Sequence, residues 1–116
     1  MALGLVVCGP KRLVAQGNVT IQAEKVMAAS SLSAVVIDPN DNPMQGVLVE
    51  EMGENWKGLL RSTRTDATGR FSFAPVKGRK IYYFMLTIPN FDQLQFRMRV
   101  SVFSRKPLKV RMKVGD

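Results

Sequence analysis

Residues 65–73 read Thr-Asp-Ala-Thr-Gly-Arg-Phe-Ser-Phe, a tight turn that leads directly into an alternating strand. The carboxylate of Asp66 can accept backbone N–H hydrogen bonds across this turn, and Gly69 can adopt the positive φ that the turn requires. Beyond the turn, the two phenylalanines point to one face of the chain and the serine between them to the other, which is the period of a half-buried strand. This stretch therefore predicts β structure with one face in an apolar core.

Six more short segments with the composition of strands surround this turn. They are rich in β-branched and aromatic residues, and clusters of Gly, Pro, Asn and Asp separate them. Together with the strand after the turn, they cover 32–37, 47–52, 59–65, 71–74, 81–88, 95–103 and 108–114. Because no segment has a helical period, these strands predict an all-β sandwich.

The chain divides into an N-terminal extension, residues 1–31, and a sandwich domain, residues 32–114. Residues 1–8 either resemble the end of a secretory signal with a faint lipoprotein-like box or form an ordinary first strand. A single cysteine, Cys8, excludes an intrachain disulfide. No apolar run approaches the roughly 20 residues of a membrane-spanning helix, so we expect no membrane span.

The rest of the extension has a weaker pattern. Residues 18–23 alternate like a strand, whereas residues 11–17 fit either a loop or a second short strand. Residues 27–31 resemble a connector, with room for a single helical turn.

Charge is distributed very unevenly along the chain. The 116 residues carry a net charge of +8. Residues 1–76 are balanced, with seven cations and seven acids, whereas residues 77–116 carry ten cations and two acids. The C-terminal part should therefore project a positive field toward a partner.

The chain contains no histidine, which excludes several kinds of active site. Ser-His-Asp and Cys-His catalysis and histidine-based zinc or iron sites all require an imidazole. No other nucleophile–base pair stands out. The sequence therefore predicts a non-enzymatic protein with no catalytic residues and no cofactor.

One turn superficially resembles a calcium loop. Asp38, Asn40 and Asn42 fall at the first, third and fifth positions of such a loop. The sixth position is Pro43 instead of glycine, and the twelfth is Val49 instead of a bidentate glutamate. We expect a plain turn and no metal site.

The last two strands carry alternating cations. If residues 95–103 and 108–114 pair as a hairpin, their Lys and Arg side chains gather on one sheet face. Like charges opposite one another are destabilising, so a partner anion or Glu50, Glu51 and Glu54 should compensate. The face is then either a docking surface for an anionic partner or a solvated edge that its charges protect against aggregation. The cations concerned are Arg97, Arg99, Lys109, Arg111 and Lys113, with Arg105 and Lys106 at the tip.

Four segments together resemble a known family. They are residues 33–38, 43–47, 65–71 and 86–91, in this order and rough spacing. Over residues 32–114 the chain resembles the carboxypeptidase regulatory-like domain. Ser33 and Asn90 stand where glycine is common in that family, and Asn tolerates the left-handed conformation better than most residues.

The resemblance implies a seven-stranded Greek-key β-sandwich of the transthyretin (prealbumin-like) type, with Asp66, Gly69 and Asn90 as structural turn residues. It also implies a non-catalytic accessory or adhesive module, located outside the cytoplasm in the periplasm, at the cell surface or in secreted form. The zinc peptidases and hydroxyisourate hydrolases related to this family use histidine ligands, which this chain lacks.

The family register assigns the two faces of residues 81–88. It places Phe84, Leu86 and Ile88 in the core and leaves Tyr83 and Met85 facing outward. Two outward apolar side chains form either an interface patch or a surface covered by the N-terminal segment.

These observations favour a binding or assembly module. We expect it to dock a protein partner, or an anionic surface, through the basic C-terminal sheet face and the neighbouring Tyr83 and Met85. The alternative is direct binding of an anionic polymer such as acidic polysaccharide, nucleic acid or lipid headgroups, whose affinity would fall steeply with salt.

Overall fold

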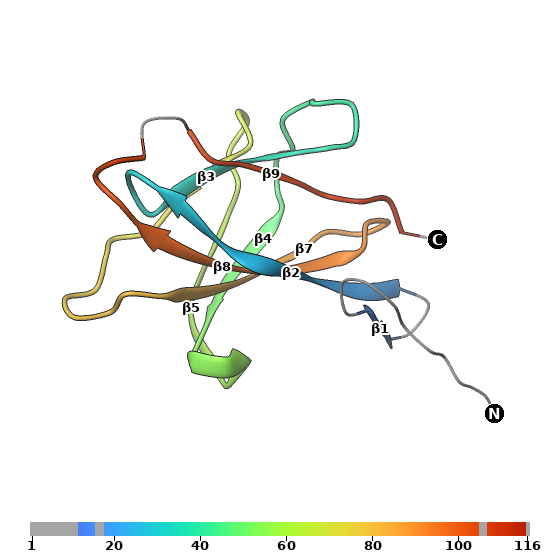
Figure 1. Ribbon diagram of the computed structural model, residues 1–116. Helices are drawn as coiled ribbons and strands as arrows, with labels where there is room; N and C mark the ends of the chain where they lie inside the picture. The colour runs from blue at the N-terminus through green and yellow to red at the C-terminus, as the bar shows by residue number, and fades with distance from the viewer. Residues whose placement is uncertain (1–11, 16–17, 105–106, 116) are drawn as a thin grey trace.

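The protein is an all-β structure with two sheets (Figure 1). The computed structural model describes residues 12–15, 18–104 and 107–115. The strands are β1 (Arg12–Ala15), β2 (Asn18–Ala29), β3 (Ser33–Ile37), β4 (Leu48–Met52), β5 (Leu59–Arg64), β6 (Arg70–Ser72), β7 (Tyr82–Thr87), β8 (Gln93–Val100) and β9 (Lys109–Arg111), with a 3-10 turn, η1 (Glu54–Trp56), after β4. One sheet has the order β1-β2-β8-β7-β4-β5, and the other has the order β6-β3-β9. Within the described residues, no helix is long and apolar enough to cross a membrane.

Both sheets bury the inward faces of their strands in one apolar core. Figure 1 shows β3 and β9 in a layer above β8 and β7. On β7, the side chains of Tyr82, Phe84 and Leu86 are buried, while those of Tyr83 and Met85 between them are half-exposed. The smaller sheet contributes Ala34, Val36, Phe71 and Val110 to the same cluster. The expected faces of residues 81–88 are therefore confirmed.

The turn at residues 65–73 has the hydrogen bonds that its sequence predicts. Oδ1 of Asp66 accepts hydrogen bonds from the Thr68 hydroxyl at 2.7 Å and from the backbone N–H groups of Thr68 and Arg70 at 2.9 and 3.0 Å. The Thr68 hydroxyl, followed by the Arg70 N–H, holds the pKa of the Asp66 carboxyl below its usual value. Gly69 has a φ of +77° and Asn90 a φ of +75°, so both occupy the left-handed region as expected.

The prediction that the last two strands pair is wrong. β8 lies between β7 and β2 in the six-stranded sheet, whereas β9 pairs in parallel with β3 in the other sheet. The alternation within each strand was predicted correctly, because Phe96 and Met98 of β8 and Val110 of β9 are buried. However, both edges of β8 are already occupied by β7 and β2, so the chain must change sheets before β9 begins.

The N-terminal strands extend the larger sheet. β2 covers the alternating residues 18–23 and continues to Ala29, so the expected connector at residues 27–31 is wrong for its first three positions. The cause is pairing with β8: Val26 to Ala29 lie opposite Arg97 to Val100 beyond an irregularity in register after Gln22. β1 is the short strand that was one of the two alternatives for residues 11–17, and residues 1–8 lie outside the described part of the chain.

Replacing Gly69 by alanine tests how closely the turn packs on β3. A Cβ at Gly69 would lie 2.7 Å from the carbonyl oxygen of Val36 and 3.0 Å from the backbone nitrogen of Met44. Gly78 has a similar φ of +83°, but a Cβ there would meet nothing within 4 Å. We expect Gly69→Ala to lower the free energy of unfolding by about 3 kcal/mol and Gly78→Ala by about 1 kcal/mol, as measured by urea denaturation. Equal losses in the two variants would contradict this close approach.

Candidate functional site

The structure divides the predicted basic residues between two opposite surfaces. Arg97 and Arg99 alternate with buried residues of β8 and therefore lie on the outer face of the six-stranded sheet. Lys109 and Arg111 alternate with buried Val110 and lie on the outer face of the three-stranded sheet. The expected single basic sheet face is therefore wrong. Lys113 is exposed beyond the end of β9, and Arg105 and Lys106 lie outside the described residues.

Two of these arginines have structural partners. Arg111 forms an ion pair with Asp41 at 2.5 Å, and its Nη1 donates to the carbonyl oxygens of Asp38 and Pro39 at 3.1 and 3.0 Å. Arg97 donates from Nη2 to the carbonyl oxygen of Glu24, which lies in the irregular part of β2. Their guanidinium groups therefore satisfy carbonyl groups within this chain.

The turn after β3 is held by its own hydrogen bonds. Oδ1 of Asp38 accepts the backbone N–H groups of Asn40 and Asn42 at 2.8 and 2.9 Å. The Asn42 N–H is the main reason that the pKa of the Asp38 carboxyl lies below its usual value. Among the residues that the structure describes, no three His, Cys, Asp or Glu side chains are grouped as metal ligands.

Tyr83 and Met85 share the outer face of the larger sheet with Arg97 and Arg99. Tyr83 lies directly opposite Arg97 in the β7–β8 register. The ring of Trp56, from η1, packs edge-on against Tyr83 with 5.0 Å between the centroids. The two alternatives for this face were an interface patch and cover by the N-terminal segment; the aromatic contact observed here comes from the loop after β4.

The most distinctive polar feature is a buried carboxylate between two arginines. The side chain of Glu51 is fully buried because it occupies an inward position of β4. Its Oε1 accepts a hydrogen bond from Nε of Arg61 at 2.6 Å, and its Oε2 accepts one from Nη1 of Arg79 at 2.5 Å. Nη2 of Arg61 also lies 2.6 Å from Oε1 but lacks hydrogen-bond geometry, so it makes an electrostatic contact only. Glu51 is thus a counter-charge, but its partners are not the C-terminal strands.

Aromatic rings hold both guanidinium groups in place. The Cζ of Arg61 lies 4.9 Å from the ring centroid of Phe73, and that of Arg79 lies 5.7 Å from that of Tyr82. Such contacts stabilise an arginine over an aromatic face.

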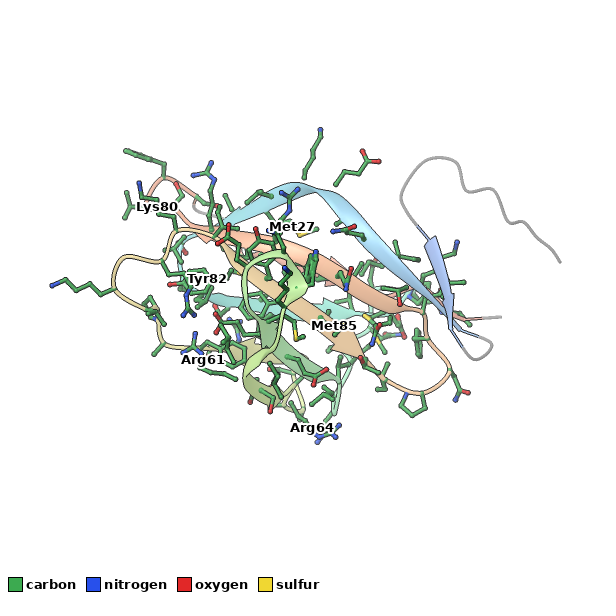
Figure 2. All side chains as sticks on the ribbon, turned by 90° about the horizontal axis from the view of Figure 1, so that it is seen from below. Met27, Arg61, Arg64, Lys80, Tyr82 and Met85 are labelled. Atoms are coloured by element: carbon green, nitrogen blue, oxygen red, sulfur yellow. The ribbon has the colours of Figure 1, made fainter. Side chains whose placement is uncertain are left out.

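Figure 2 shows Arg61, Tyr82 and Lys80 at the same end of the molecule. Since one carboxylate serves two guanidinium groups, the cluster keeps a surplus positive charge.

This cluster borders an open pocket of about 470 Å³ between residues 75–82 and the end of β8. Its cationic side chains are Arg79, Lys80 and Arg99, and the described residues form no ion pair with Lys80 or Arg99. Among the residues that the structure describes, no acidic one lines this pocket. Its apolar walls come from Pro75, Val76, Ile81, Tyr82 and Val100. We call it the cationic pocket.

Exposed apolar side chains continue from the pocket along the chain. Val76 and Val100, in its wall, are 37% and 38% exposed, and Val102 and Phe103 in the following turn are 82% and 88% exposed. On the other side of residues 79–81, Glu54 lines a neighbouring hollow together with Arg79 and Lys80. This end of the molecule therefore combines cations with apolar surface, the composition of a binding site.

Only part of this site had a signal in the sequence. Arg99 was among the predicted cations, but Arg79 and Lys80 were not. The missed signal was the alternation of side chains along β4. Val49 and Glu51 are two positions apart and point to the same side of the strand, so burial of Val49 in the core also buries the carboxylate of Glu51. A buried carboxylate requires a positively charged partner, so this alternation predicts that arginines lie nearby but does not identify which ones.

No protein-family model matches the chain, and no curated protein is significantly similar to it. The site must therefore be interpreted from its geometry.

The buried ion cluster should be essential for stability. Glu51→Gln leaves two arginine side chains without their shared counter-charge, so we expect the free energy of unfolding to fall by about 3 kcal/mol in urea denaturation. Glu50→Gln is the matched control, because Glu50 lies next in the strand on the outer face and should change stability by less than about 0.5 kcal/mol. A loss at Glu51 no larger than at Glu50 would contradict the assignment.

Proposed function

We propose that this protein is a non-catalytic binding module of the carboxypeptidase regulatory-like, transthyretin-like type. The order β8-β7-β4-β5 opposite β6-β3-β9 supports the proposal, with β1 and β2 as additions at one edge. Between β3 and β9 the chain changes sheets four times: after β3, β5, β6 and β8. Repeated sheet changes are typical of Greek-key sandwiches. A location outside the cytoplasm belongs to the same proposal.

The function that the geometry supports best is docking of an acidic protein partner at the cationic pocket. The observation that carries this proposal is the grouping of Arg79, Lys80 and Arg99 around an apolar pocket that no acidic side chain of the described part of the chain lines. Complementary charge would steer an acidic partner to this end of the molecule. Of the predicted cations, Arg99 belongs to this site, whereas Lys109, Arg111 and Lys113 do not.

The apolar surface favours a protein over a simple polyanion. A chain of phosphates or sulfates would neutralise the cations but would leave Val100, Val102 and Phe103 in contact with water. A protein interface usually combines an apolar centre with a polar rim, and so would cover both. Tyr83 and Met85 lie on the adjoining outer face of the larger sheet and would extend such an interface.

Binding of an anionic polymer remains the second candidate. Ten cations and two acids in residues 77–116 favour it, because each neutralised phosphate or sulfate releases a counterion. This reading requires only charge and makes no use of the pocket's apolar wall. Docking at the cationic pocket therefore depends on where the cations lie, whereas binding of an anionic polymer depends mainly on how many there are.

Charge reversal at two places tests the proposal. The probe is fluorescent poly-L-glutamate at low salt, and the site variant is Lys80→Glu with Arg99→Glu. The control variant, Lys109→Glu with Lys113→Glu, changes the net charge equally on residues outside the site. We expect the site variant to weaken binding at least about tenfold and the control variant less than about threefold.

Equal weakening in both variants would contradict a localised docking site. If heparin also bound with a steeper salt dependence than poly-L-glutamate, and both variants reduced it equally, the anionic-polymer reading would replace the proposal.

A further inference from the structure

The cationic pocket has the composition of a site for one particular chemical group. We infer that it binds a single carboxylate joined to an apolar chain, with the carboxylate at Arg79, Lys80 and Arg99 and the chain against Val76, Ile81 and Val100. This inference concerns the same surface as the proposed function, but it specifies the group that enters the pocket.

Arg79 is fixed in a position suited to receiving an anion. Its Nη1 is held by Glu51 and its guanidinium lies over Tyr82, so little side-chain freedom is lost on binding. Within the described residues, its Nε and Nη2 groups donate to no protein acceptor. A guanidinium with two free donors binds a carboxylate in a bidentate manner.

The pocket wall selects an apolar chain behind the charge. Pro75, Val76, Ile81 and Val100 provide aliphatic surface, and Tyr82 contributes to the same lining. Small-molecule pockets are typically apolar with a few charged groups that fix the orientation of the ligand. A compact inorganic anion would leave the aliphatic wall in contact with water. An uncharged apolar molecule would form no ion pair with the cations.

Glu54 places a negative charge beside two of the cations. It lines the neighbouring hollow with Arg79 and Lys80 but does not line the cationic pocket. Removing its charge should raise the positive potential at the cationic pocket. Glu54→Gln should therefore tighten binding of an anionic ligand, whereas a purely apolar ligand would not respond.

Titration with three eight-carbon probes tests the inference. We would add octanoate, octanol and octylamine separately to the 15N-labelled full chain and follow the amide resonances of Val76, Ile81 and Val100. Octanoate should produce saturable shifts, and the other two probes should not. Arg99→Gln should weaken octanoate binding about tenfold, which corresponds to one charge-assisted contact. Lys109→Gln on the opposite sheet should leave it unchanged.

Two sources of this carboxylate can be separated in the same way. An acetylated peptide ending in leucine with a free carboxylate is compared with its amide and with octanoate. Tighter binding of the free-acid peptide identifies a protein C-terminus, and tighter binding of octanoate identifies a fatty-acid-like ligand.

Octanol binding as tightly as octanoate, or no saturable shift with any probe up to about 10 mM, would overturn the inference, because even one charge-assisted contact and a buried chain should give millimolar affinity. That result would not affect the docking proposal, which is tested separately by the localised binding of poly-L-glutamate. Failure of the pocket ligand and failure of the docking proposal are therefore distinguishable.

Discussion

The apolar core shared by both sheets determines where the charges of the C-terminal strands can go. Phe96 and Met98 reach the core from the six-stranded sheet, and Val110 of β9 and Met112, directly after it, reach the core from the other side. Burying each such side chain is worth about 1.5–3 kcal/mol, far more than an exposed charge can contribute. Because side chains alternate along a strand, the cations of β8 and β9 must then point away from one another.

A buried carboxylate supplies the second constraint and links the fold to the site. Glu51 lies at an inward position of β4, where an unpaired charge would be strongly destabilising. Arg61 from β5 and Arg79 from the segment before β7 neutralise it, and Arg61 also donates to the carbonyl oxygen of Ala74 at 2.8 Å. The bonds that stabilise the interior thus also tie the loop between β6 and β7 to the sheet. The same bonds position Arg79 in the wall of the cationic pocket.

Local features of the fold could be predicted from the sequence, whereas long-range pairing could not. The hydrogen bonds of Asp66 and the positive φ of Gly69 follow from a few neighbouring residues, and the inward sets of β7 and β8 follow from period-2 alternation. The pairing partner of a strand cannot be predicted in this way, because an alternating strand can pair equally well with several other alternating strands. β8 pairs with β2, about 70 residues earlier in the chain, and no local sequence pattern predicts that pairing. The cationic pocket joins Arg79 and Arg99 across the β7–β8 pairing. The position of Arg79 there depends on its contact with Glu51 of β4, which the sequence did not indicate.

The assignment of the last two strands to different sheets is tested most directly by backbone NOEs measured on the full chain. We expect cross-strand contacts between the backbones of Val36 and Val110 and between those of Met27 and Met98, as the parallel registers require. Side-chain contacts across the core are expected in either arrangement, so only backbone contacts are informative. Cross-strand backbone NOEs between residues 93–100 and residues 109–111 would mean that these strands pair, and would contradict both the separated charges and the cationic pocket as the principal basic site.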